Sequence, residues 1–182
     1  MPALFLHADD PFWRPQRAAA LVALLADLGL LGDRWDCDGP VRYLAGHNFL
    51  QLLMFLGCSP QVALVPGEGG SGAAVCFVRV HIFAEPVFLS ARPPPAVRCA
   101  QCRARASLPA KFGCSTPFRC SACGAKTNAA DLDWRQGAGC GCFFIEVDGV
   151  YPQEAIPSDK LLEALARFAG CTWKYFFADE PL

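Results

Sequence analysis

Charged side chains are scarce in this chain of 182 residues, because Asp, Glu, Lys and Arg together make up only 18% of it. Soluble domains average about 25%. Hydrophobic residues reach 53%, but the longest apolar stretch, 18–31, is interrupted by Asp27 and Gly29 and is too short to span a bilayer. We therefore expect no membrane association, and the surplus apolar surface favours a protein partner or a second copy of the chain.

A basic leader is also absent. The first ten residues, MPALFLHADD, contain no Lys or Arg and become acidic at Asp9 and Asp10. A secretory signal needs a positively charged segment before its apolar stretch, so we expect none here. The cysteine count is eleven, an odd number, which does not fit a framework made only of disulfides. These features favour a reducing, cytoplasmic location.

Catalytic patterns are equally scarce. Only three histidines are present, His7, His47 and His81, and none stands at the spacing of a known catalytic motif. The glycine-rich stretch 66–72 lacks the Lys-Ser/Thr of a phosphate-binding loop. His81 and Arg79 alternate outward on an expected strand and could line a small anionic site, although an ordinary polar surface explains them more simply.

What the sequence does contain is a mixture of strand-like and helix-like segments. Helices are expected at 14–28, 48–56 and 158–169, where apolar residues recur at helical spacing or a glycine follows as a stop. The clearest strand is 75–83, in which apolar and mixed positions alternate. Without regular βαβ alternation, these segments predict an α+β domain with a mixed or antiparallel sheet and about three helices.

Shorter segments complete this picture. Glu85-Pro86 is expected to interrupt the clear strand, and Asp148-Gly149 predicts a two-residue hairpin. Residues 32–40 are expected to form a polar loop and 66–72 a flexible one, while 92–95 is a stiff polyproline linker. Further short strands are expected at 4–7, 41–44, 61–65, 87–89, 142–147, 150–155 and 171–177.

The strongest motif is a repeated Cys-x-x-Cys pair. Cys99 and Cys102 form the first pair, Cys120 and Cys123 form the second, and 17 residues separate them. Each pair presents two sulfurs from one tight turn, so together they supply the four soft donors that a tetrahedral zinc ion takes at about 2.3 Å. Because protein fills every position, the site is expected to be structural. Iron on the same sulfurs is the main alternative, and redox-active dithiols are a remoter one.

Residues 97–126 resemble the zinc ribbons, a structural class of small β domains. The resemblance implies that a β-hairpin joins the two cysteine turns and that the metal supplies folding energy that so short a segment lacks. Gly124 suits the left-handed backbone expected after the second pair, whereas Arg103 takes that place after the first. We therefore divide the chain into 1–91 and 131–182, two parts of one α+β domain, and 92–130, an inserted ribbon with its linker.

The seven other cysteines lie mostly in apolar runs, where a thiol behaves as a small hydrophobic side chain. Cys114 is a possible substitute ligand, and Cys140-Gly-Cys142 could bind a metal or form a disulfide, although a buried strand entry is the simpler interpretation of these two. The seven are Cys37, Cys58, Cys76, Cys114, Cys140, Cys142 and Cys171.

The ribbon differs in charge from the rest of the chain. The window 98–126 holds six basic residues and no acidic one, which leaves ten bases against 17 acids elsewhere, a net charge of −7. Thiolates on a bound zinc offset two of the positive charges, so the loaded ribbon keeps about +4. These basic residues could contact phosphates, and Phe112 and Phe118 could stack on nucleobases, so the ribbon would suit nucleic acid. The six are Arg98, Arg103, Arg105, Lys111, Arg119 and Lys126.

Three functions are compatible with these features. The leading hypothesis is a cytoplasmic protein-binding or adaptor module with a structural zinc, which partners another protein or a second copy of itself. The first alternative is an enzyme with a pocket between the main sheet and the ribbon, using His81, Arg79 or a cysteine outside the motif. The second is a nucleic-acid-binding accessory protein that uses the basic ribbon face.

Overall fold

The computed structural model describes residues 3–35, 41–56, 62–64, 74–91, 96–109, 111–150 and 154–178. The polyproline linker at 92–95 and the glycine-rich loop at 66–72 lie outside these residues, as do Cys37 and Cys58. Within the described part, no helix has the length and hydrophobicity that crossing a membrane requires.

A six-stranded antiparallel sheet forms the centre of the molecule, in the order β12-β1-β10-β7-β3-β2. Together with three helices it confirms the α+β class. The strands are β1 (Ala3–Ala8), β2 (Leu31–Trp35), β3 (Arg42–Ala45), β7 (Phe77–Ser90), β10 (Ala138–Asp148) and β12 (Trp173–Ala178).

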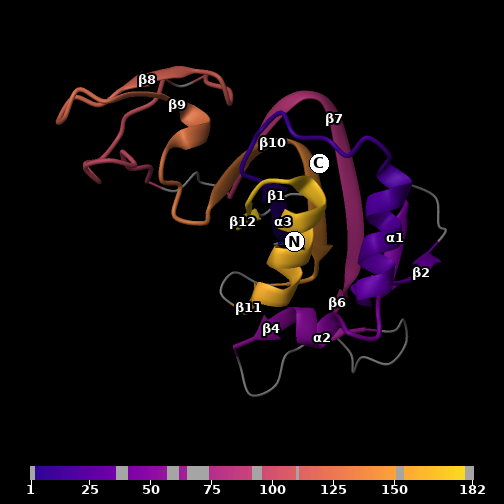
Figure 1. The fold of residues 1–182 in the computed structure, drawn as a ribbon. Coiled ribbons are helices and arrows are strands. Elements are labelled where there is room, and N and C mark those ends of the chain that lie inside the picture. Colours follow the sequence, from indigo (N-terminus) through magenta and orange to yellow (C-terminus); the bar gives the residue numbers. More distant parts are fainter. Residues whose placement is uncertain are drawn as a thin grey trace.

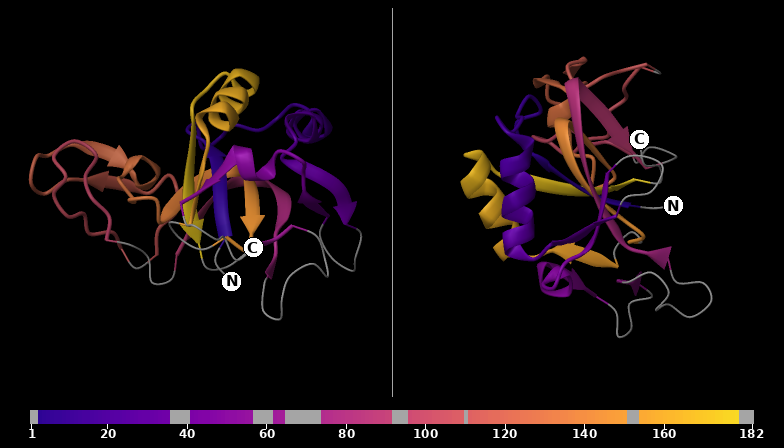
Figure 2. Two further views of the ribbon diagram at one scale, coloured as in Figure 1. Left: turned by 90° about the horizontal axis from the view of Figure 1, so that it is seen from below. Right: turned by 90° about the vertical axis from the view of Figure 1, so that its right-hand side faces the viewer.

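Helices α1 (Ala18–Leu28) and α3 (Asp159–Ala169) cover one face of this sheet, as Figures 1 and 2 show. Their apolar stripes pack on strand residues that alternate toward them, and the contact forms the main core. The Ser158 hydroxyl accepts the Leu161 N–H at the start of α3, and Gly170, at φ 73°, ends that helix in the left-handed conformation.

Smaller elements lie around the sheet. The short helix α2 (Phe49–Leu52) leads into β4 (Leu53–Phe55), and β5 (Val62–Ala63) pairs in parallel with β6 (Ala74–Val75). Beside the sheet, β8 (Pro117–Arg119) and β9 (Lys126–Asn128) form a two-stranded ribbon, followed by the 3-10 turn η1 (Ala129–Asp131) (Figure 1).

The strand β7 is longer than expected, because Glu85-Pro86 does not end it. Its pairing with β10 shifts register between Gly141 and Phe143, and its partners resume at Val87. Pro86 therefore falls in the bulged stretch of β7, where its missing N–H leaves no ladder hydrogen bond unmade. The prediction of a break was wrong because the sequence does not reveal the register.

Several other local expectations were also wrong. Helix α1 begins at Ala18, after a non-helical Arg17, and the expected loop at 32–40 begins as strand β2. Helix α2 ends after one turn, where β4 takes over. Among the residues that the structure describes, none after Asp148-Gly149 pairs back with β10, and β11 (Ala155–Pro157) pairs with β4. The pairings of β2 and β4 depend on strands elsewhere in the chain, which override local propensity.

The opposite face of the sheet encloses a second core. Strand β12 contacts β7 although β1 and β10 separate them in the sheet order, so the sheet curls over this face. Phe5, Phe144 and Phe176 are fully buried there, and the rings of Phe5 and Phe176 stack with centroids 5.3 Å apart. Strand residues are therefore buried on both faces of the sheet, under the helices on one face and within the curl of the sheet on the other.

A buried ionic cluster lies on the same face. The Arg79 guanidinium donates to both oxygens of the Glu146 carboxylate, at 2.8 and 2.5 Å, and to Asp148 at 3.2 Å. His81 Nε2 lies 2.6 Å from Glu146 Oε2. Burial raises the pKa of Glu146, but the hydrogen bonds from His81 and Arg79 outweigh burial and lower it. Arg79 and His81 do face one anion, as the sequence allowed, and that anion is the chain's own Glu146.

Candidate metal centre

Two backbone turns of the same geometry present the four cysteines. In the first, Cys99 N–H donates to the Ala104 carbonyl and Arg103 N–H donates to the Cys99 carbonyl, both at 2.9 Å. In the second, Cys120 N–H donates to Ala125 and Gly124 N–H to Cys120, again at 2.9 Å. The residue after each pair is left-handed, with φ 60° at Arg103 and 75° at Gly124. The arginine accepts a conformation that glycine adopts without strain.

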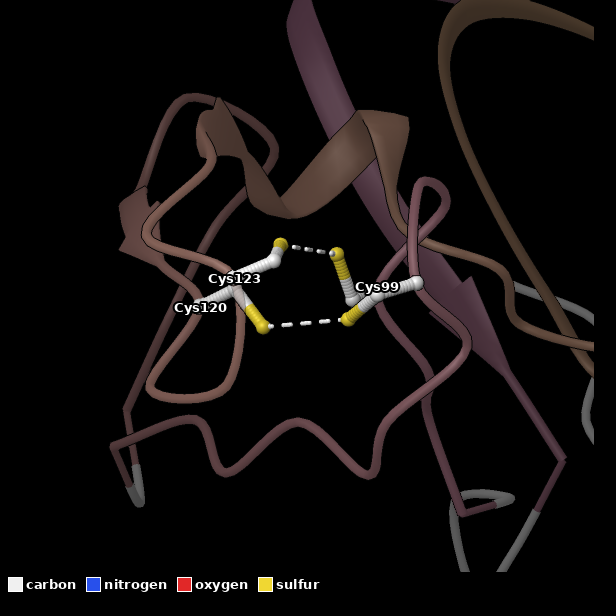
Figure 3. A group of neighbouring side chains, drawn as sticks. Cys99, Cys120 and Cys123 are labelled. Carbon is white, nitrogen blue, oxygen red and sulfur yellow. Dashed lines mark hydrogen bonds between the residues drawn. The ribbon is translucent and has the colours of Figure 1, made fainter.

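The sulfurs of the two turns face one another (Figure 3). The Sγ atoms of Cys99 and Cys123 are 3.9 Å apart, and those of Cys102 and Cys120 are 3.6 Å apart. All four lie within 4.8 Å of one another. A tetrahedron with zinc–sulfur bonds of about 2.3 Å places its sulfurs about 3.8 Å apart. The four cysteines named by the motif therefore form a cluster of metal-binding dimensions.

No known protein family, curated protein or solved structure is detectably similar to this chain. Any role of the cysteine cluster therefore has to follow from its own geometry.

Proton affinity within the cluster is uneven. Backbone N–H groups of Cys123 and Ala122 donate to the Cys120 sulfur and lower its pKa to about 6. For Cys102, the Ala104 backbone lowers the pKa, but hydrogen bonds with the Cys123 and Cys120 sulfurs outweigh it and raise the pKa to about 12. Cys120 therefore gives up its proton more readily than Cys102, and binding of a cation by all four sulfurs would displace protons.

Around the turns, the ribbon has a small core of its own. Phe118 is buried, and Phe112 stacks on Trp134 with ring centroids 5.7 Å apart. Phe88 of β7 packs against both of those rings, at 4.8 and 4.7 Å. The Trp134 indole N–H donates to the Ala129 carbonyl at 2.8 Å. Of the two residues expected to stack on bases, Phe118 is buried inside the ribbon, and Phe112 is half-buried against Trp134 and Phe88.

The other described cysteines do not join the cluster. Burial raises the pKa of Cys76 to about 12. Cys114 and Cys140 hydrogen-bond to each other, which raises the pKa of Cys140 far above its usual value and lowers that of Cys114. Within the described residues, the four motif cysteines make the one group placed to hold a metal, so neither Cys114 nor Cys140-Gly-Cys142 takes part.

A cavity of about 500 Å³ lies between the sheet and the residues that follow the ribbon. His7, Gly139 and Lys174 line it from the sheet, and Arg103 and Asp133 line it from the ribbon side. Arg79 and His81 are not among its lining residues. No motif in the sequence distinguishes His7, which was expected to be an ordinary polar residue at a strand end.

The His7 side chain is enclosed on the curled face of the sheet. It is 8% exposed, its Nδ1 is buried without a hydrogen-bond partner, and its ring lies 5.6 Å from that of Phe176. A Cβ on Gly139 would come within 2.4 Å of the Phe176 ring and 2.9 Å of His7 Nε2, so glycine is needed there. The pKa of His7 is lowered to about 4, mainly by burial. Lys174 contributes to the lowering, and Asp9 opposes it.

This burial predicts acid sensitivity. The unfolded chain binds a proton at His7 near pH 6.5, whereas the folded chain does so only near pH 4. The buried, neutral His7 therefore contributes stability above pH 6.5. This contribution is lost as the pH falls from 6.5 toward 4, by about 2 kcal/mol between pH 7 and pH 5. Urea unfolding at the two pH values measures the loss, and His7→Leu should reduce it by that amount. Equal losses in the two proteins would contradict the assignment, even if acid also releases a bound metal, since both proteins share that effect.

Proposed function

We propose that the cluster of Cys99, Cys102, Cys120 and Cys123 binds one structural zinc ion and that the ribbon folded around it is a protein-binding module. The sulfur spacing of 3.6 and 3.9 Å is the observation that carries the metal proposal. Four protein sulfurs complete a tetrahedron and leave no position for water or substrate, which favours a structural role over a catalytic one. A ribbon with so small a core gains its folding energy from the metal.

Protein binding is favoured over nucleic-acid binding by the placement of the aromatic rings. Recognition of single strands relies on exposed rings that stack on bases. Phe118 and Trp134 are buried in the ribbon core, and one face of the half-buried Phe112 ring lies against Trp134. Outside the window 98–126 the chain carries a net charge of −7, which would repel an extended phosphate backbone. A protein partner can contact the ribbon alone.

The cavity beside the ribbon favours a second candidate, a small-molecule pocket. Its volume of about 500 Å³ lies within the range of known ligand sites. His7 is held neutral by burial and has no carboxylate hydrogen-bonded to it among the described residues, so it lacks the orienting partner of a general base. The pocket therefore supports ligand binding more directly than catalysis, and it ranks second.

Metal content is the direct test of the site. Protein purified without added metal is expected to contain one zinc ion per chain by elemental analysis, because the four sulfurs match a zinc tetrahedron. The protein should also be colourless, since zinc has no visible absorption when bound by thiolates. One iron per chain with an absorption band in the visible range, or no metal, would overturn the zinc assignment.

Copurification tests whether the ribbon is a protein-binding module. Proteins that copurify with the tagged wild-type chain are compared with those that copurify with Cys120→Ser, in which the ribbon is expected to unfold. Partners lost from the variant bind through the ribbon. If the same partners copurify with both proteins, the ribbon is not the binding element.

A further inference from the structure

At two places in the ribbon, two positively charged residues lie directly opposite each other on paired segments. Arg98 forms an antiparallel bridge with Arg105, and Arg119 lies opposite Lys126 in the β8–β9 ladder. Like charges directly opposite are destabilising in a sheet. The chain nevertheless places such a pair beside each cysteine turn.

The two pairs follow from one repeated sequence. Arg-Cys-x-x-Cys-x-Ala-Arg occupies 98–105, and Arg-Cys-x-x-Cys-x-Ala-Lys occupies 119–126. In both, the residue before the first cysteine pairs with the residue seven positions later. The two turns also share their backbone hydrogen bonds, from Cys99 to Ala104 and from Cys120 to Ala125. The cation pairs are thus repeated features of the ribbon, one at each cysteine turn.

The backbone brings the charges of each pair close together. Hydrogen bonds from Cys99 to Ala104 and from Ala106 to Val97 flank the Arg98–Arg105 pair, which makes it non-hydrogen-bonded. The bond from Cys120 to Ala125 puts Arg119 and Lys126 in the same arrangement. Pairs of this kind have the shortest separation between their Cβ atoms, about 4.5–5.5 Å.

No acidic side chain neutralises these four residues within the described part of the chain. The nearest candidate, Asp133, lies opposite Arg98, but its carboxylate forms an ion pair with Arg103 at 3.7 Å. Arg98 instead donates to the Arg103 carbonyl at 3.3 Å. Arg105, Arg119 and Lys126 are exposed.

A role in balancing the thiolates does not account for the pairs. Side chains alternate across a strand, so Arg98 and Cys99 point to opposite faces, as do Arg119 and Cys120. Their burial agrees with this, since Cys99 and Cys120 are each 2% exposed while Arg119 is exposed. The cations are therefore presented to solvent, away from the sulfurs.

We propose that the pairs Arg98–Arg105 and Arg119–Lys126 form a docking surface for an acidic segment of a partner protein. This inference rests on the protein-binding role of the ribbon and specifies the chemistry of its partner. Carboxylates of such a segment would bridge the like charges of each pair through charge-assisted hydrogen bonds. The negatively charged remainder of the chain would repel such a segment, so its attraction is confined to the basic ribbon.

The test measures binding of a fluorescein-labelled oligoglutamate peptide to the zinc-loaded full chain by fluorescence anisotropy. The double variant Arg105→Gln/Lys126→Gln removes one cation from each pair and is expected to weaken binding roughly tenfold, the effect of losing two charge-assisted contacts. Lys111→Gln, which removes an exposed ribbon cation outside the pairs, should change the affinity less than about twofold. Added salt should weaken binding to the wild type more than to the double variant.

Four outcomes would overturn the proposal. If Lys111→Gln, which removes one charge, causes half or more of the loss of binding free energy that the double variant causes by removing two, only the overall charge matters. A loss of zinc from the double variant would assign the cations to the metal site instead. Tighter binding of a DNA duplex or single-stranded RNA than of the peptide, lost in the double variant, would identify nucleic acid as the ligand. If a ribbon-dependent partner binds the double variant normally, this surface is excluded while the protein-binding function itself stands.

Discussion

Replacing Cys120 with serine is expected to release the metal and unfold the ribbon. Backbone N–H groups lower the pKa of the Cys120 sulfur to about 6, and the Cys120 backbone anchors the second cysteine turn. Four-cysteine zinc sites contribute an apparent binding energy of about 10–16 kcal/mol at neutral pH. Serine offers a far weaker ligand, so the expected loss exceeds the stability of a small domain. Elemental analysis measures the zinc, and circular dichroism with proteolysis of 97–126 measures the fold.

The matched control is Cys171→Ser, since Cys171 lies outside the cluster and is only partly exposed. It should retain one zinc ion per chain. The main core and the ribbon core share no buried residue, so the sheet is expected to remain folded in Cys120→Ser, as the proposed domain division requires. Full retention of zinc would contradict the ligand assignment, and simultaneous loss of the sheet would contradict the division.

Replacing Arg79 with methionine is expected to destabilise the protein by about 3–5 kcal/mol, because it leaves the fully buried Glu146 carboxylate without its cation. Removing one partner of a buried pair costs more than removing both. The double variant Arg79→Met/Glu146→Leu should therefore recover much of the loss. Urea unfolding at pH 7 measures both proteins, and a double variant no more stable than Arg79→Met would contradict this account.

The single variant Arg79→Met is also expected to weaken the pH dependence of stability that comes from Glu146. In the wild type the pKa of Glu146 is lowered, so its contribution to stability is present above the unfolded pKa near 4.5 and is lost as the pH falls. Without Arg79, burial is opposed only by His81, so the pKa of Glu146 should rise from its wild-type value and the ionised group should contribute less stability at pH 7. The destabilisation should thus be smaller at pH 4.5 than at pH 7.

The fold class was predictable because it depends on local patterns. Helical spacing of apolar residues identified α1 and α3, and glycines marked their ends at Gly29 and Gly170. Alternation identified β7. The errors arose where an element depends on a distant partner, as when β4 replaced the second half of an expected helix and paired with β11, about a hundred residues away in the chain.

The candidate site, like the fold, could be predicted only in part. The four cysteines were predictable because each pair lies within one turn, and a metal of tetrahedral preference needs two such turns. The cation pairs were not recognised as pairs, because only the register places Arg98 opposite Arg105 and Arg119 opposite Lys126. The contact of Phe112 with Phe88 of the sheet likewise joins residues that the sequence does not place together.

The sequence by itself determined an α+β protein with a compact four-cysteine cluster and a locally basic ribbon, since spacing within a turn or helix fixes which side chains share a face. Only the tertiary structure decided what these residues contact. Arg79 and Glu146 meet across β7 and β10 from positions 67 residues apart, and His7 is buried by rings from two other strands. Such contacts depend on strand register and sheet curvature, because a shift of one residue would turn each side chain to the other face.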